Sequence, residues 1–263
     1  MKKFAVIGDP IQHSLSPTLH GEVYEQLGIE ADYQRQSVRA ESLPSFVANN
    51  GLDGFNVTLP HKETIIAHLS SLDSSADCVG AVNCVYRNIG YNTDWTGFLR
   101  AAEMKEINLN GKSCMILGAG GVARSVALAL IVAGVASISV TNRSKDRADR
   151  LLSWIQERMP SNAPTEAPEM IINCTPVGMW PNTKQLPIDN SGTESASILV
   201  DTIYNPLETE WLKRGRKRGA TTMEGLEMFI AQGLASADIW FQDCISEIVN
   251  IGRIRQTMES ALC

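Results

Sequence analysis

The sequence lacks the cysteine and histidine patterns that crosslink or metallate small proteins. Its 6 cysteines form no CxxC pair, and its 4 histidines lack metal-ligand spacing relative to any cysteine pair. A chain of 263 residues is also long enough to bury its own hydrophobic core without disulfides. We therefore expect reduced thiols, no bound metal and a cytoplasmic location.

Long hydrophobic runs and an excess of positive charge are also missing. The best candidate for a membrane span, 125–142, is apolar only over 126–136, well short of the roughly 20 residues that a span needs. The apolar run near the start stops at Gly8, too early for an export signal. With 23 basic and 29 acidic residues, the net charge is −6. This balance disfavours a nucleic-acid partner, and we expect no membrane partner.

Short apolar runs alternate with helical patterns, which is typical of parallel βαβ units and predicts an α/β fold. The length favours two domains. Strands are expected at 4–7, 33–38, 54–58, 113–117, 138–141, 170–173 and 198–201, with a hairpin over 82–86 and 90–91. Helices are expected at 18–27, 95–107, 122–133, 224–241 and 245–262.

A glycine-rich motif in the second half predicts a dinucleotide site. Gly118, Ala119, Gly120, Gly121 and Val122, followed by an alanine, fit G-x-G-x-x-A between a predicted strand and a predicted helix. Glycines there let backbone N–H groups approach a pyrophosphate, and the start of the helix favours its negative charge. The alternative is a glycine-rich turn with a packing role only.

The end of the next strand favours NADP over NAD. An NAD site usually has an acidic residue there, but this chain has Asn142, Arg143, Ser144 and Lys145. The guanidinium of Arg143 can bind a 2′-phosphate as a bidentate fork, aided by Ser144 and Lys145. The alternative is a solvated basic start of a helix.

Polar clusters in the first half follow predicted strands, where open α/β sheets bind ligands. Ser14 and Ser16 suit a carboxylate, although capping of a helix explains either serine equally well. Lys62 could transfer a proton if a carboxylate such as Asp94 held it, and Asn83 adds an amide. A surface lysine and ordinary turn residues are the alternatives for this second group.

Together these segments resemble the shikimate dehydrogenase family over the whole chain. The shared motifs are HSLSP at 13–17, NVTLPHK at 56–62, GAVN at 80–83, NTD at 92–94, GAGG at 118–121, NR at 142–143, NCTPVGM at 173–179, Tyr-Asn-Pro at 204–206 and EGLEMFIAQ at 224–232. Two positions depart from the family pattern: Gly21 follows His20 where asparagine is common, and Cys84 follows Asn83 where threonine is frequent. Neither is a proposed catalytic residue.

The resemblance implies an NADP-dependent oxidoreductase that interconverts 3-dehydroshikimate and shikimate in aromatic amino acid biosynthesis. Lys62 and Asp94 are then the catalytic pair, with Lys62 handling the proton of the substrate oxygen. The implied substrate-binding residues are Ser14, Ser16, Thr58, Asn83, Asp94, Tyr204 and Gln232. Thr202, Ile203 and Gly225 would border the nicotinamide.

The implied architecture is an α/β substrate domain at 1–100, a Rossmann-type doubly wound NADP domain at 101–231, and a C-terminal helical segment at 232–263 that packs on the first domain. The active site is expected in a closing cleft between the domains. A small-molecule substrate is expected, in a monomer or homodimer. The alternatives are a quinate/shikimate dehydrogenase using NAD or NADP, and a non-catalytic dinucleotide sensor, which the intact Lys62 and Asp94 disfavour.

Overall fold

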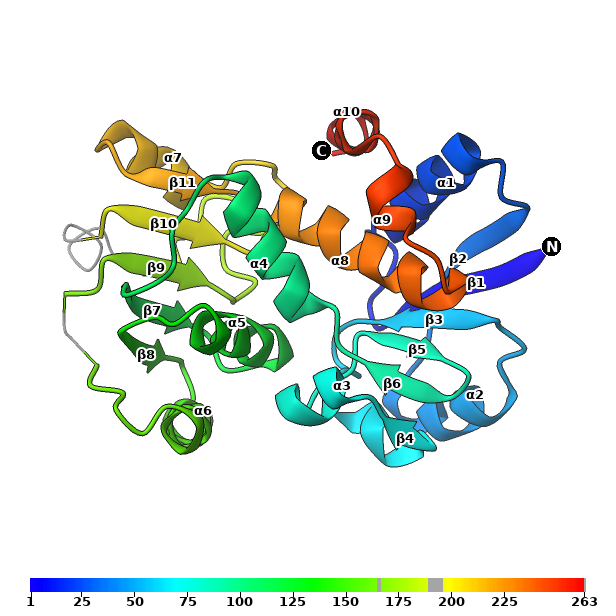
Figure 1. The fold of residues 1–263 in the computed structure, drawn as a ribbon, viewed down its shortest axis with the longest axis horizontal. Helices are drawn as coiled ribbons and strands as arrows, with labels where there is room; N and C mark the ends of the chain where they lie inside the picture. Colours follow the sequence, from blue (N-terminus) through cyan, green and yellow to red (C-terminus); the bar gives the residue numbers. More distant parts are fainter. Residues whose placement is uncertain (165–166, 189–195, 263) are drawn as a thin grey trace. The chain divides into compact units, whose positions relative to one another are not determined.

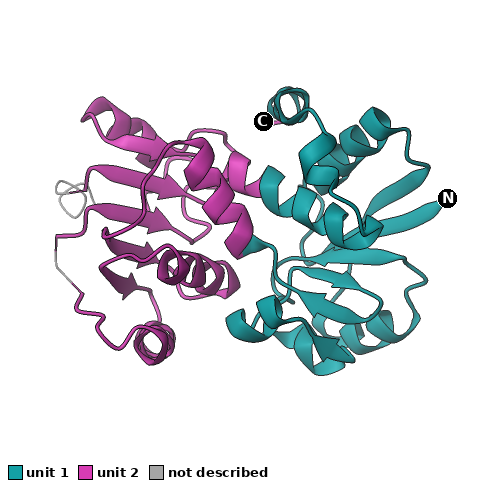
Figure 2. Cartoon of the chain, in the orientation of Figure 1, with its two compact units in different colours: residues 1–94, 230–261 teal, residues 95–229, 262–263 magenta. Residues whose placement is uncertain are grey.

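The computed structural model describes residues 1–164, 167–188 and 196–262, and the chain divides into two compact units. Unit 1 comprises residues 1–94 and 230–261, and unit 2 comprises 95–229 and 262–263 (Figure 2). Each unit has its own sheet with helices packed against it, which confirms the predicted two-part α/β class. Within the described ranges, no helix combines the length and the apolar character that a membrane span requires.

Unit 1 contains a six-stranded sheet, among the residues described, in the order β2-β1-β3-β5-β6-β4 (Figure 1). Its parallel part is formed by β1 (Lys2–Gly8), β2 (Ala31–Ser37) and β3 (Gly54–Val57). The hairpin strands β5 (Cys84–Tyr86) and β6 (Ile89–Tyr91) are antiparallel, as predicted, and β4 (Ser71–Leu72) pairs with β6. Apolar side chains such as Ile7 and Phe55 form the core beneath this sheet.

The helices of unit 1 connect these strands. Helix α1 (Ser16–Leu27) follows β1 and packs against β2 and α10 (Ile251–Ser260). The shorter helical elements are η1 (Ala40–Ser42), α2 (Leu43–Asn49), η2 (Thr64–His68), α3 (Ser74–Val79) and α9 (Ile245–Ile248). Helices α4 (Asp94–Met104) and α8 (Gly225–Phe241) each have residues in both units.

Unit 2 contains a five-stranded sheet in its described residues, in the order β11-β10-β9-β7-β8, and all of its pairings are parallel (Figure 1). The strands are β7 (Ser113–Leu117), β8 (Ser137–Thr141), β9 (Met170–Asn173), β10 (Ile198–Asp201) and β11 (Thr221–Met223). Helices α5 (Gly121–Val132), α6 (Lys145–Arg158) and α7 (Glu210–Lys217) pack against β7, β8 and β10 respectively.

One predicted helix is wrong. The segment 245–262 is not continuous, because the chain is extended at Val249 and Asn250 between α9 and α10. Asn250 caps α10 by accepting a hydrogen bond from the N–H of Arg253 at 3.0 Å. The apolar spacing runs on across the break, so helical periodicity alone could not reveal it. Two predicted strands also end one residue early, at Ser37 and Val57.

The register of the strands brings functional loops together. In unit 2, Leu117 pairs with Asn173, and Asn173 pairs with Asp201, so β7, β9 and β10 end side by side. In unit 1, Ile7 pairs with Val57, so the loops after β1 and β3 begin at one edge. These are the strand ends at which ligands bind in open α/β sheets.

Candidate functional site

The centre of the candidate site in unit 1 is a buried ion pair. The Nζ of Lys62 donates to Oδ2 of Asp94 at 2.6 Å, and both residues are buried. Lys62 lies in the loop between β3 and η2, and Asp94 begins α4. An ammonium group paired and hydrogen-bonded in this way is fixed in space and can exchange a proton with a bound oxygen atom. The structure thus brings together the two residues that were predicted to act as a pair.

Asn83 holds the other oxygen of Asp94. Its Nδ2 donates to Oδ1 of Asp94 at 2.9 Å and lies 3.1 Å from Oε1 of Gln232. Its Oδ1 accepts the N–H of Thr93 at 2.7 Å, and the Thr93 hydroxyl donates to the carbonyl of Gln232 at 2.9 Å. Thr93, through Asn83, therefore links the Lys62–Asp94 pair to α8. No role was predicted for Thr93, although its place beside Asp94 was the available signal.

Ser14 and Ser16 form a second hydroxyl cluster in unit 1. The two Oγ atoms lie 3.2 Å apart at the start of α1, where Leu15 occupies the N-cap position. Ser14 Oγ also accepts the N–H of Ser16 at 3.3 Å, so part of the capping alternative stands for Ser14. Thr58 follows β3, and a Cβ on Gly8 would lie 2.7 Å from its methyl carbon. Gly8 therefore leaves the space that Thr58 occupies.

Asn56 is the centre of a buried polar network in unit 1 that was not predicted from the sequence. Asn56 Oδ1 accepts the hydroxyl of Tyr33 at 2.7 Å, while its Nδ2 donates to Ser236 at 2.9 Å and to the carbonyl of Asn83 at 3.0 Å. The His20 ring stacks on Tyr33 with centroids 4.3 Å apart. Burial lowers the pKa of His20 to about 3, against an opposing hydrogen bond with Asn56, so its imidazole is neutral.

Cys84, one of the two departures from the family pattern, lies within the core of unit 1. It is fully buried, and burial raises the pKa of its thiol to about 12. A thiol that stays protonated is a poor nucleophile. Cys84 therefore packs as a small apolar residue.

The glycine motif in unit 2 has the geometry of a phosphate-binding loop. Gly118 follows β7 with φ of +113°, and a Cβ there would lie 3.0 Å from the carbonyl oxygen of Cys174. Gly120 is the N-cap of α5, and no described heavy atom lies within 4 Å of a Cβ placed on it. Ala119 and Val122 are half-buried, while Gly121 is the buried first residue of α5. Backbone N–H groups at such a helix start fit a dinucleotide pyrophosphate.

The residues predicted to bind the 2′-phosphate lie in the turn between β8 and α6. Arg143, Ser144 and Lys145 are exposed, and Asn142 donates through Nδ2 to the carbonyl of Ser144 at 3.0 Å. This contact closes the turn and leaves the basic side chains on its surface. A cationic, hydroxyl-bearing turn next to the glycine loop fits an anionic group.

The segment after β10 contains Thr202 and Ile203, two of the residues predicted to border the nicotinamide. Gly225 lies against it, since a Cβ on Gly225 would be 2.5 Å from the carbonyl carbon of Thr202 and 2.6 Å from the oxygen of Ile203. The predicted cofactor neighbours are thus brought together. Tyr204, predicted to bind substrate, lies in unit 2 with its ring 4.3 Å from that of Phe229.

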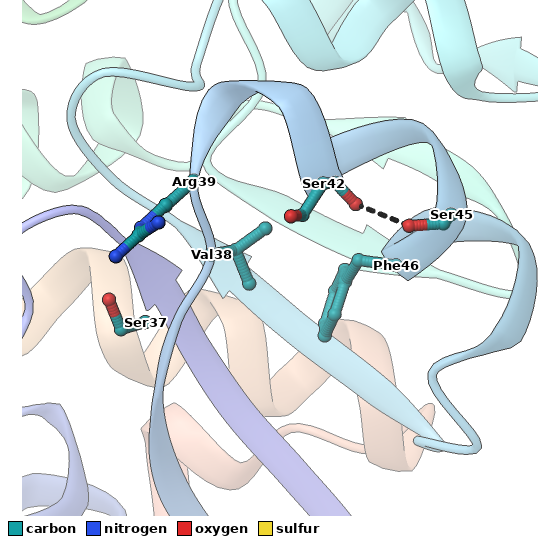
Figure 3. Close-up of a pocket in the computed structure, with 6 residues that line it drawn as sticks. All are labelled: Ser37, Val38, Arg39, Ser42, Ser45 and Phe46. Carbon is teal, nitrogen blue, oxygen red and sulfur yellow. Dashed lines mark hydrogen bonds between the residues drawn. The ribbon is translucent and has the colours of Figure 1, made fainter.

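One surface pocket of unit 1 contains none of the residues predicted to bind substrate or cofactor. It is lined by Ser37, Val38, Arg39, Ser42, Ser45 and Phe46 (Figure 3). Ser45 donates to the carbonyl of Ser42 at 2.9 Å, and the remaining groups offer no acid–base pair. Among the described residues, no cluster of three or more His, Cys, Asp or Glu side chains is arranged to hold a metal ion.

Comparison with known proteins gives two family matches. The model of the shikimate dehydrogenase substrate binding domain matches residues 6–85, and the model of shikimate / quinate 5-dehydrogenase matches residues 100–176. A shikimate dehydrogenase (NADP(+)) of Symbiobacterium thermophilum is 38% identical over 257 residues, covering 90% of this chain and 87% of the relative. Another of that name, from Geobacillus kaustophilus, is 36% identical and covers 99% of both chains.

Solved structures show the same likeness in three dimensions. The crystal structure of shikimate 5-dehydrogenase from Thermus thermophilus in complex with NADP(H) and shikimate has a TM-score of 0.88 to this chain. It is 32% identical in sequence, and the match covers 100% of both chains.

Proposed function

We propose the function of this chain from its place among known enzymes: it belongs to the shikimate dehydrogenase family. It is an NADP-dependent oxidoreductase acting on a CH–OH group, and it reversibly reduces 3-dehydroshikimate to shikimate in aromatic amino acid biosynthesis. The observation that carries this proposal within the structure is the buried Lys62–Asp94 pair, 2.6 Å apart and placed in the matched substrate unit.

Lys62 and Asp94 are proposed as the catalytic pair. In the direction of reduction, Lys62 donates a proton to the oxygen of the substrate carbonyl as that oxygen gains negative charge. Asp94 keeps the ammonium group in place, and the amide of Asn83 keeps Asp94 in place, as their contacts of 2.6 and 2.9 Å support. In the reverse direction Lys62 accepts the hydroxyl proton.

The substrate-binding set is proposed to be Ser14, Ser16, Thr58, Asn83, Asp94, Tyr204 and Gln232. Hydroxyls of Ser14, Ser16 and Tyr204 suit the carboxylate of shikimate, and the other side chains suit its ring hydroxyls. The 3.2 Å contact between the two serine hydroxyls supports a shared ligand.

NADPH supplies the hydride when it is bound. The residues proposed to hold it are Gly118, Ala119, Gly120, Gly121, Val122, Asn142, Arg143, Ser144, Lys145, Thr202 and Gly225. The backbone of the glycine loop and the start of α5 would bind the pyrophosphate, and Arg143 would bind the 2′-phosphate. The names of the curated relatives, which specify NADP(+), support this choice of cofactor.

The decisive experiment follows the loss of NADPH absorbance when 3-dehydroshikimate is added to purified protein. We expect turnover with NADPH and much less with NADH. In the reverse direction, NADP with shikimate should react and NADP with quinate should not. Absence of turnover with every pair would contradict the proposal and favour a dinucleotide sensor. Faster oxidation of quinate than of shikimate would favour a quinate dehydrogenase.

We further propose that the enzyme acts in the cytoplasm on a small-molecule substrate, as a monomer or homodimer. Among the described residues, Cys78, Cys84, Cys114 and Cys244 are free thiols, which suits a reducing compartment. Size-exclusion chromatography with light scattering would separate the two assembly states.

A further inference from the structure

Asp201 is a buried carboxylate in unit 2 to which the steps above assign no role. It ends β10 and is 1% exposed. Its Oδ1 accepts the N–H of Ile203 at 3.0 Å and Nδ2 of Asn173 at 3.1 Å, and its Oδ2 accepts the hydroxyl of Thr209 at 2.9 Å. Because burying a carboxylate costs free energy even when it is bonded, its presence calls for a specific task.

The two oxygens of Asp201 serve different parts of unit 2. Oδ2 holds Thr209, whose hydroxyl also accepts the N–H of Leu212 and so caps α7. Oδ1 holds the backbone of Ile203 directly after the strand. One oxygen therefore supports a helix, and the other fixes the segment that contains the proposed neighbours of the nicotinamide.

Other contacts hold the same segment. Thr202 donates through its N–H at 3.0 Å and its hydroxyl at 2.9 Å to the carbonyl of Asn173. Gly225 donates its N–H to the carbonyl of Ile203 at 3.1 Å. Asn173 keeps further bonds of its own, donating to the Val177 carbonyl at 3.2 Å and accepting from Thr175 at 2.7 Å. The loop after β9 therefore has anchors that do not depend on Asp201, whereas Ile203 N–H bonds to Asp201 alone among the contacts described.

We propose that Asp201 is a positioning residue for the nicotinamide end of NADPH. Its Oδ1 sets the backbone of Ile203 against Gly225, and the edge that this contact fixes receives the nicotinamide. The inference rests on the proposed function. Burial raises the pKa of Asp201 to about 7, opposed by the three hydrogen bonds, which agrees with a group kept for its acceptor geometry rather than for its charge.

Three variants separate this role from general support of the fold. Asp201→Leu keeps the branching of the side chain at Cγ, enlarges it and removes both acceptors. Asp201→Asn keeps an acceptor for Ile203 and Asn173 and can donate to the Thr209 hydroxyl, so it should rescue binding. Thr209→Val removes the arm that supports α7 and leaves the Ile203 arm in place. It is therefore the matched control for lost stability.

The readout is the Kd of two probes, NADPH and 2′,5′-ADP, measured by titration calorimetry on the full chain. Adenosine 2′,5′-bisphosphate occupies only the adenosine half of the site. We expect Asp201→Leu to weaken NADPH by about tenfold, the size of one lost hydrogen bond, and to change 2′,5′-ADP less than about twofold. Asp201→Asn should bind NADPH within about threefold of wild type, and Thr209→Val should bind both probes normally at a lower Tm.

Equal weakening of both probes by Asp201→Leu would overturn the inference, because Asp201 would then support unit 2 as a whole. So would a loss of NADPH affinity in Thr209→Val as large as that in Asp201→Leu. If Asp201→Leu does not fold, Asp201→Ala, which also lacks an acceptor, replaces it with the same expectation. Failure of the wild type to bind NADPH would overturn the proposed function as well, and this separates the two failures.

Discussion

At the scale of single residues, the Lys62–Asp94 pair makes the most direct prediction. Lys62→Ala removes the proton donor and should lower kcat by about 10²- to 10⁴-fold, while the KM for shikimate changes much less. Steady-state kinetics of shikimate oxidation at saturating NADP measure both constants. Lys112→Ala is the matched control, since Lys112 pairs with Glu169 at 2.9 Å in unit 2, and its kcat should be normal. Near-normal turnover by Lys62→Ala would contradict the assignment.

Ser14 and Ser16 test the binding of the substrate carboxylate. The double variant Ser14→Ala/Ser16→Ala should raise the KM for shikimate about tenfold or more, because the carboxylate loses two donors. Its Tm should change little, since the bond from the N–H of Ser16 to Ser14 Oγ at the start of α1 is long, at 3.3 Å, and Leu15 occupies the N-cap. Kinetics and thermal melting on the same preparation decide the point. A sharp fall in Tm with an unchanged KM would instead identify the pair as structural.

Arg143 tests the selection of NADP. Arg143→Ala should weaken NADPH by about tenfold or more and scarcely change the KM for NADH, because the guanidinium meets only the 2′-phosphate. The kcat at saturating NADPH should stay near that of wild type. Arg150→Ala, an exposed arginine further along α6, provides the control. Equal losses for both cofactors would mean that Arg143 supports the fold or the shared pyrophosphate.

Part of this site could be predicted from residue types in the sequence. The rest depends on contacts that only the folded chain shows. Lys62 and Asp94 were proposed as a pair from their types and their places beside predicted strands, although 32 positions separate them, and the resemblance added their catalytic role. Asn56, Thr93 and Asp201 were not predicted. In a sequence, a polar residue beside a strand looks like any turn residue, and only the folded chain shows that all three are buried.

At the scale of elements, continuous apolar runs predicted the bounds of strands most accurately. The strands β9 and β10 occupy the predicted ranges 170–173 and 198–201, since central parallel strands are apolar on both faces. The short helices α2 and α3 were missed, because fewer than eight residues give too few turns for a periodic pattern. The break between α9 and α10 was missed because it depends on one capping side chain, Asn250, and a single residue does not interrupt the apolar periodicity.

That break can be tested through Asn250. Asn250→Ala removes the acceptor for the N–H of Arg253 at the start of α10 and should destabilise the protein by about 1 kcal/mol. A change of this size lowers Tm by roughly 2–4 °C in a chain of this length, with kcat unchanged. Gln256→Ala, exposed on the same helix, is the control. An unchanged Tm for Asn250→Ala would show that packing, rather than the cap, ends the extended link.

At the scale of the whole molecule, the two units contain buried groups that respond to pH in opposite ways. In unit 1, burial lowers the pKa of His20 from 6.5 to about 3. As the pH falls, the unfolded chain binds a proton at His20 before the folded chain does. The free energy of unfolding is therefore unaffected by His20 above pH 6.5 and decreases as the pH drops toward 3. In unit 2, burial raises the pKa of Asp201 from 3.8 to about 7. The contribution of Asp201 to the free energy of unfolding is fully present below pH 3.8 and is lost as the pH rises through 7.

Between about pH 7 and about pH 4.5 each shift corresponds to roughly 3 kcal/mol, so acidification should destabilise unit 1 and stabilise unit 2 by similar amounts. Hydrogen exchange in urea, followed by mass spectrometry and corrected for intrinsic rates, reports on β1 and β10 separately. His20→Phe keeps a ring beside Tyr33 and should abolish much of the acid loss in unit 1, whereas Asp201→Asn should abolish the acid gain in unit 2. Each variant serves as the control for the other, because its mutation lies in the opposite unit. Parallel changes in both units, unaffected by either variant, would show that the surface carboxylates rather than these two buried groups set the pH dependence.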